Sequence, residues 1–235
     1  MRIKKGSVLI TLGLAMILGA FGLAFWNMYD ENRAQASTEG IMEQLKEQLP
    51  ENHREEPAVP AETEIQSLDV HEPSEPAAQI PGEVEIPDYQ LDPQREMVVK
   101  MINGRPYIGV LAVPTLGLEL PVIQEWSYPN LRVAPCRYVG SVYSDDLVIA
   151  AHNYISHFGN LKRLQPGDPV TFTDMEGNIF HYEVAVLETL EPTAVEEMTS
   201  GNWDLSLFTC TVGGKLRVTV RCELIGEEPN VGDPA

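Results

Sequence analysis

Three residues of chemically reactive type each lie at or near the end of a strand-like segment. Cys210 ends one short apolar and β-branched run, Arg217 lies in the run that follows after a brief turn, and His152 directly follows another run. A thiolate is a nucleophile, an imidazole transfers protons near neutral pH, and a guanidinium can stabilise an oxyanion. Together these residue types predict nucleophilic acyl transfer, provided that the fold brings them together.

The three cysteines, Cys136, Cys210 and Cys222, are an odd number, so at least one thiol is unpaired. If a four-residue hairpin loop follows Cys210, then Cys210 opposes Lys215 and shares a face with Arg217. Cys222 then lies on the other, core-facing side. A register slip of one residue would reverse these faces. The alternative for Cys210 is a structural role, either buried or in a disulfide with Cys136.

Rival residues accompany two members of this set. Arg221 lies on the same predicted face as Arg217, so either arginine could serve the thiol. His157 follows His152 at the start of a helix that we expect over residues 157–164, and we expect its side chain to be exposed. A metal site built from both histidines and a cysteine lacks recognisable ligand spacing, so we expect none.

An apolar segment near the N-terminus predicts a membrane anchor. Val8–Trp26 is uncharged, and its nineteen residues span roughly 28 Å as a helix, which matches a bilayer core. Basic residues precede the segment and acidic residues follow it, which favours a cytoplasmic N-terminus. We expect an uncleaved single-pass anchor in the cell membrane with the rest of the chain outside. The alternative is a signal peptide cleaved near Ala34–Ala36.

Composition divides the rest of the chain. The net charge of −19 and the lack of a basic patch argue against nucleic-acid binding. Prolines recur among acidic residues before position 96, a composition typical of a linker, although Ile41, Met42, Leu45 and Leu49 have helical spacing. We therefore expect a cytoplasmic stub and anchor over residues 1–29, an acidic Pro-rich stalk with a possible short helix over 30–95, a folded domain over 96–227, and a tail over 228–235.

The folded domain reads as mainly β. Short β-rich runs alternate with turn residues such as Gly117 and Gly213-Gly214, which predicts an antiparallel-rich barrel or sandwich. The predicted strands are Tyr107–Pro114, Leu118–Val122, Leu147–Ala151, Pro169–Thr173, Ile179–Leu190, Leu205–Cys210 and Lys215–Ile225.

Over residues 100–226 the sequence resembles the sortases, the cysteine transpeptidases of the Gram-positive cell surface. Their nucleophile lies in a Thr-Leu-x-Thr-Cys pattern, which here reads Ser206-Leu207-Phe208-Thr209-Cys210. Their histidine follows two small residues, as in Ala150-Ala151-His152, and their arginine lies on the strand after the cysteine, here Arg217 before Val218-Thr219-Val220. His152-Asn153 and Phe158-Gly159-Asn160-Leu161 are similar to class B members, but the stretch between Glu196 and Leu205 is short for their helical insertion. The resemblance leaves the subclass open.

The resemblance implies a closed eight-stranded β-barrel with short helices. It also implies that Cys210 attacks a Leu-Pro-x-Thr-Gly-like sorting motif, that His152 acts as acid and then base, that Arg217 stabilises the oxyanion, and that Thr209 contributes to substrate binding. The implied partners are secreted proteins bearing that motif and an amine of a peptidoglycan precursor or pilin, with no metal or organic cofactor. The alternatives are a non-catalytic, surface-anchored β-domain that binds or scaffolds a partner, and plain hydrolysis by the same site.

Overall fold

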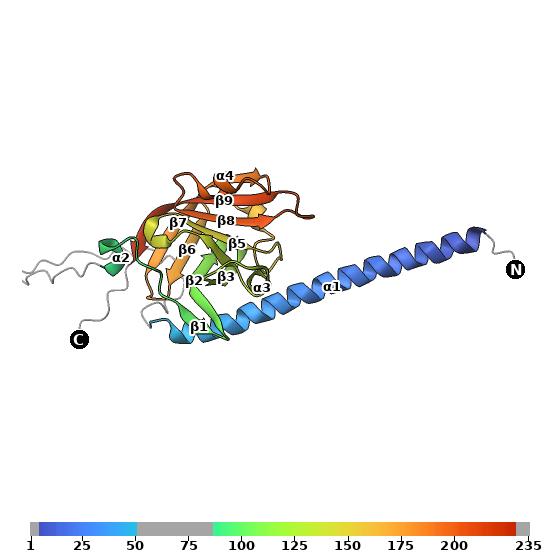
Figure 1. Cartoon of the computed structure of the whole chain (residues 1–235), viewed down its shortest axis with the longest axis horizontal. Helices are drawn as coiled ribbons and strands as arrows, with labels where there is room; N and C mark the ends of the chain where they lie inside the picture. The colour runs from blue at the N-terminus through green and yellow to red at the C-terminus, as the bar shows by residue number, and fades with distance from the viewer. Residues whose placement is uncertain (1–4, 51–86, 229–235) are drawn as a thin grey trace, which may run out of the picture.

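A computed structural model describes residues 5–50 and 87–228 of the chain. These residues form a long helix followed by a sheet-rich domain with short helices (Figure 1). The strands are β1 Lys100–Ile102, β2 Arg105–Val113, β3 Leu118–Ile123, β4 Cys136–Val139, β5 Leu147–Ala151, β6 Pro169–Asp174, β7 Ile179–Leu190, β8 Leu205–Cys210 and β9 Arg217–Glu228. The α-helices are α1 Lys5–Gln48, α2 Asp88–Leu91, α3 Tyr128–Leu131 and α4 Val195–Thr199, and the 3-10 helices are η2 Pro114–Leu116, η3 Val142–Ser144 and η4 Leu161–Arg163.

Eight of the strands form a closed ring. The pairing order is β2-β3-β4-β5-β8-β9-β7-β6, and β6 pairs back with β2, while β1 extends from β2 as a short hairpin partner. Most neighbours are antiparallel, but β3 with β4 and β5 with β8 run parallel. The predicted closed ring of eight strands with short helices is therefore confirmed. Closure leaves no long exposed edge on these strands, which removes a site for unwanted strand pairing.

All seven predicted strands are present, and three of them have the predicted bounds. The two strands that we did not predict, β1 and β4, have only three and four residues. Such short runs contain too few alternating positions for a period-two pattern to stand out from a loop. The expected helix over residues 157–164 is wrong, because that stretch forms turns and the three-residue helix η4.

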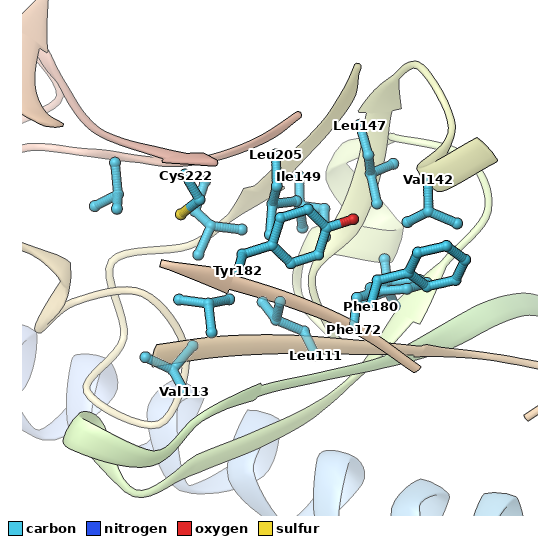
Figure 2. Packing of buried hydrophobic residues seen from close by; sticks show 14 of the residues in the cluster. Leu111, Val113, Val142, Leu147, Ile149, Phe172, Phe180, Tyr182, Leu205 and Cys222 are labelled. Atoms are coloured by element: carbon cyan, nitrogen blue, oxygen red, sulfur yellow. The ribbon is translucent and has the colours of Figure 1, made fainter. Parts of the chain in front are cut away.

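Apolar side chains from opposite sides of the ring meet in its interior. Figure 2 shows Leu111 and Phe172 below Tyr182, with Leu205 and Cys222 facing them from other strands. Each of these side chains is almost fully buried. Cys222 thus lies in the core, as the parity of the β9 strand predicts.

The ring closes between β2 and β6, where Gly109 pairs with Asp174. A Cβ atom at position 109 would overlap the Phe172 ring and the Thr173 carbonyl, so the backbones can approach this closely only without a side chain.

Helix α1 extends away from the ring, and its C-terminal end lies beside β1 and β3 (Figure 1). That end packs its apolar stripe, Ile41, Met42 and Leu45, against Tyr107, Ile123 and other residues on the outside of the ring. Leu45 is fully buried, which contributes about 2 kcal/mol to this contact. The structure therefore differs from the expected linker over residues 30–48, which form one continuous helix seated on the domain. The proline-rich part of the expected stalk, 51–86, lies outside the described residues.

The N-terminal half of α1 has the properties of a membrane span. Its apolar segment is long enough to cross a bilayer, and none of that segment is buried against the rest of the protein. Large apolar side chains such as Leu9, Ile17 and Phe25 are more than half exposed. A soluble helix would bury such a stripe, so this arrangement makes α1 a candidate membrane span.

Candidate active site

His152 and Cys210 emerge at the same edge of the ring. They follow directly on the last parallel pair of β5 and β8, in which Ala151 lies beside Thr209. Adjacent strands are about 4.8 Å apart, so the residues that leave their carboxyl ends together are neighbours. The short, fully buried run Leu147–Ala151 fixes this position, because all five of its side chains face protein on both sides of the sheet.

Arg217 lies directly across from Cys210. Strands β8 and β9 are antiparallel, and Cys210 and Arg217 are the last register partners before the loop that connects the two strands. Opposed residues share a face, so the predicted pairing of the thiol with this arginine's face is confirmed. The predicted partner Lys215 is wrong by two residues, because the connection spans residues 211–216 rather than four residues. A shift of two residues leaves each side chain on the same face of the strand, so the predicted face of Arg217 is correct.

One cavity of about 220 Å³ is lined by all three residues. Trp126 and Tyr138 form part of one wall, and α4 and the residues before it form another. Tyr138 also stacks edge-on against Phe208, with ring centroids 5.4 Å apart, which braces that wall. The full lining is Trp126, Tyr128, Leu131, Tyr138, Ala150, Ala151, His152, Glu191, Pro192, Ala194, Val195, Met198, Phe208, Thr209, Cys210 and Arg217.

The two arginines that the sequence left as rivals have different surroundings. Arg217 is half-buried at the cavity, where its Nη1 donates to the backbone carbonyls of Gly214 and Leu216 at 3.1 and 3.2 Å. Those are turn carbonyls that water can replace, so the guanidinium can turn to a bound group. Arg221 does not line the cavity and is only 2% exposed.

The Arg221 guanidinium is held by four hydrogen bonds. Its Nε donates to Glu188 Oε1 at 2.7 Å, and its Nη1 donates to Ser206 Oγ at 2.8 Å and to the Met198 carbonyl at 2.9 Å. Its Nη2 donates to the Glu197 carbonyl. These contacts tie β9 to α4, so Arg221 supports the wall of the cavity while Arg217 faces into the cavity.

Thr209 joins the two parallel strands immediately before the candidate residues. Its side chain is 3% exposed, and its hydroxyl donates to the Ala151 carbonyl at 2.8 Å. This bond sets the spacing between the ends of β5 and β8, one residue before His152 and Cys210. Thr209 also lines the cavity. Its hydroxyl is thus already engaged within the protein, which favours a positioning role over direct contact with substrate.

Cys210 differs from the other two cysteines in its surroundings. All three thiols are free, so the alternative disulfide between Cys136 and Cys210 does not form. Cys136 and Cys222 are fully buried, and burial raises the pKa of each thiol to about 12. A thiol with so high a pKa stays protonated and inert near neutral pH. Cys210 alone is partly exposed and opposite a cation.

His152 is half-buried, and its pKa is lowered from the usual value. Burial is the largest cause, because it disfavours the charged imidazolium, and the nearby Arg132 acts in the same direction. The carboxylate of Asp30 acts in the opposite direction. The imidazole also contacts the Tyr154 ring, with centroids 4.9 Å apart. His152 is thus a mainly neutral imidazole whose pKa depends on charges contributed by two separate elements.

The exposed position that we expected for His157 is wrong. Its side chain is fully buried, and its Nε2 lies 3.3 Å from the Thr38 hydroxyl of α1. Burial, aided by His152, lowers the pKa of His157 to about 4, so it is neutral in the folded protein. His157 is a structural residue beneath the loop that carries His152.

Helix α1 holds that loop at two further points, and neither could be identified from the sequence. The Tyr154 hydroxyl donates to Asp30 Oδ2, and the Ile155 backbone N–H donates to Glu31 Oε1 at 2.8 Å. These partners are more than a hundred residues apart in the chain, so no local pattern links them. The only local signal was Tyr154 itself, an aromatic residue two positions after the histidine. Across residues 5–50 and 87–228, no cluster of three or more His, Cys, Asp or Glu side chains could hold a metal ion.

Residues 111–225 match a family model described as the Sortase domain. No curated protein matches the chain. Among solved structures, sortase A from Corynebacterium diphtheriae is similar at 24% identity and a TM-score of 0.47, covering 54% of this chain and 64% of that chain. A Clostridium perfringens sortase D5 transpeptidase is similar at 22% identity and a TM-score of 0.47, covering 54% of this chain and 83% of that chain. Sortase C1 from Streptococcus suis is similar at 26% identity and a TM-score of 0.45, covering 51% of this chain and 73% of that chain.

Proposed function

The chain belongs to the sortase family, and from that premise we propose that it is a membrane-anchored cysteine transpeptidase. It cleaves a Leu-Pro-x-Thr-Gly-like sorting motif in a secreted protein and transfers the acyl fragment to an amine. The amine belongs to a peptidoglycan precursor or to another surface protein such as a pilin. The observation that carries the proposal is the shared cavity, in which Cys210, its register partner Arg217 and the neighbouring His152 meet.

In the first half-reaction the Cys210 thiol gives its proton to neutral His152, and the resulting thiolate attacks the Thr carbonyl carbon of the motif. The carbonyl π electrons move onto oxygen, and Arg217 donates hydrogen bonds to that oxyanion from the facing strand. The tetrahedral intermediate collapses, the Thr–Gly C–N bond breaks, and protonated His152 gives its proton to the leaving glycine amine. The product is a thioester between Cys210 and the Thr carbonyl.

The second half-reaction reverses these roles. Neutral His152 removes a proton from the incoming amine, which attacks the thioester carbonyl and displaces the Cys210 thiolate. The lowered pKa of His152 suits this base step, because it keeps the imidazole neutral near pH 7. With water in place of the amine, the same thioester would be hydrolysed instead. Choice of acceptor therefore decides between transfer and hydrolysis.

We place the domain outside the cell, with α1 crossing the membrane and the N-terminus inside. The exposed apolar half of α1 and the basic residues before it support this orientation. Because the same helix continues into the domain and packs on it, the cavity is held at a fixed distance from the bilayer rather than on a free tether. Such placement would favour substrates that are themselves tethered at the membrane surface.

The test is a transpeptidation assay on the full chain in detergent micelles, with a sorting-motif peptide and a glycine-based amine acceptor. We expect ligated product from the native protein and none from Cys210→Ala, whereas the matched control Cys222→Ala, which removes a buried thiol, retains product. Equal product from native protein and Cys210→Ala, or none from either, would reject the proposal and leave a binding or scaffolding domain. Product formed with water alone would identify a hydrolase.

A further inference from the structure

A second cavity, of about 500 Å³, lies where α1 meets the domain, and its lining is basic. Arg33 comes from α1, Arg105 begins β2, and Arg132 follows α3, so three distant segments each bring a guanidinium to one hollow. The other lining residues are Ser37, Tyr128, Pro129 and Val133, and none is a carboxylate. In a chain of net charge −19, three arginines at one carboxylate-free cavity are an unusual concentration of positive charge.

These arginines are largely available to a ligand. Arg105 Nε donates to the neutral Asn130 amide oxygen at 3.3 Å. Arg33 lies 3.6 Å from Asp30, the nearest acidic group, and its side chain remains 53% exposed. Within the described residues, neither Arg105 nor Arg132 forms an ion pair with a carboxylate. Guanidinium groups without a carboxylate partner bind phosphate oxygens well, because each can donate two parallel hydrogen bonds.

The height of the cavity relative to the membrane indicates the source of such a phosphate. Trp26 and Tyr29 are exposed on α1 at the end of its apolar segment, and exposed Trp and Tyr side chains mark the membrane interface. Arg33 follows Trp26, where the apolar segment ends, by seven residues, which is about 10 Å along the helix. The headgroup layer extends roughly 5–8 Å beyond the hydrocarbon core, so the long Arg33 side chain can reach back to the level of the lipid phosphates. Arg105 and Arg132 line the same cavity.

We propose that the cavity formed by Arg33, Arg105 and Arg132 is a binding site for a phosphate group, and that its ligand is the phosphate of a membrane lipid headgroup. The choice of a lipid rests on the outward orientation proposed above, whereas phosphate binding itself does not. The site would fix the orientation of the domain and α1 together relative to the membrane, and would hold the Cys210 cavity at the membrane surface.

The arginine-lined cavity and the Cys210 cavity are adjacent, so a ligand bound in the first can change the electrostatics of the second. Tyr128 lines both of them. Arg132 also carries the charge that, together with burial, lowers the pKa of His152, and a bound phosphate would counter that charge. Phosphate binding would therefore shift the proton affinity of the candidate acid–base residue, which links contact with the membrane to the state of the active site.

The experiment is calorimetric titration of the full chain in uncharged detergent micelles. The probes are a short-chain phosphatidylglycerol, the corresponding diacylglycerol without a phosphate, and inorganic pyrophosphate. We expect the phosphatidylglycerol to bind, the diacylglycerol not to bind, and Arg105→Gln or Arg132→Gln to weaken binding about 10-fold each, as loss of a charge-assisted bond predicts. The matched control is Arg163→Gln, which removes the same charge from an exposed position in η4.

Tighter binding of the phospholipid than of pyrophosphate supports a lipid ligand, whereas the reverse order would reject the lipid and leave a soluble phosphate ester. Equal affinity in Arg105→Gln and Arg163→Gln, or no binding of either phosphate probe, would overturn the site altogether. The same titration on Cys210→Ala, which lacks the thiol needed for acyl transfer, should give unchanged phosphate binding. Failure of the transpeptidase proposal is thereby separated from failure of the phosphate site.

Discussion

Replacing the two arginines of β9 should separate stability from activity, because Arg221→Gln should mainly destabilise the fold and Arg217→Gln should mainly slow the reaction. In Arg221→Gln, the buried Ser206 hydroxyl, two backbone carbonyls and Glu188 lose their guanidinium partner. Removing one member of a buried ion pair costs about 3–5 kcal/mol, and because Glu188 is 36% exposed we expect the lower end, about 3 kcal/mol. For a domain of this size that loss lowers Tm by roughly 10 °C.

Arg217→Gln removes only hydrogen bonds to turn carbonyls that water can replace, so the free energy of unfolding should change by less than about 1 kcal/mol. Its acyl-transfer rate should instead fall about 10²–10³-fold, because an oxyanion donor is lost. Urea denaturation and initial rates of peptide cleavage on both variants make the comparison. The reasoning is refuted if Arg221→Gln is as stable as the native protein, or if Arg217→Gln retains full activity.

Substitutions at three further positions test the region around His152. Asp30→Asn should lower the His152 pKa further, because the Asp30 carboxylate raises it, and an unchanged or higher pKa in an NMR titration would contradict this. His157 has a pKa of about 4 in the folded protein and about 6.5 in the unfolded chain, so it should contribute stability above pH 6.5 that is lost as the pH falls towards 4, by up to about 3 kcal/mol. In His157→Gln, denaturation curves should show a weaker dependence of stability on pH. An equally steep dependence in the variant would contradict this. Thr209→Val should lower the free energy of unfolding by about 1 kcal/mol and reduce the rate of peptide cleavage, because the Ala151 carbonyl loses its hydrogen-bond donor. Thr209→Ser keeps the hydroxyl and should retain both stability and rate. Loss of either in Thr209→Ser would disprove the positioning role.

The relation between Cys210 and Arg217 could be predicted from the sequence because it depends on strand parity. Alternation of side chains along a strand is insensitive to a register error of two residues, and that was the error in the predicted hairpin. Cys222 could be assigned to the core for the same reason. The run Leu147–Ala151 is entirely apolar, so a buried strand there, with His152 at its end, could also be predicted from the sequence.

The environment of His152 could not be predicted, because it depends on α1. The helix buries Ala34, Thr38, Ile41 and Leu45 against the domain, but only the last two belong to the apolar stripe that was visible in the sequence. The acidic composition around them resembles a solvated linker. His157 was therefore expected to be exposed, since its partner Thr38 lies 119 residues away. Contacts of such separation leave no periodic signal in a single sequence.

The central claim is that Cys210 forms a thioester with the acyl part of a sorting motif, and trapping that adduct tests it most directly. The full chain would be mixed with a Leu-Pro-x-Thr-Gly peptide in the absence of an amine, quenched in acid, digested and analysed by mass spectrometry. We predict a mass increase on the peptide that contains Cys210, equal to the motif up to its Thr, and its absence in His152→Ala. An adduct on Cys136 or Cys222, or no adduct at any time point, would contradict the account.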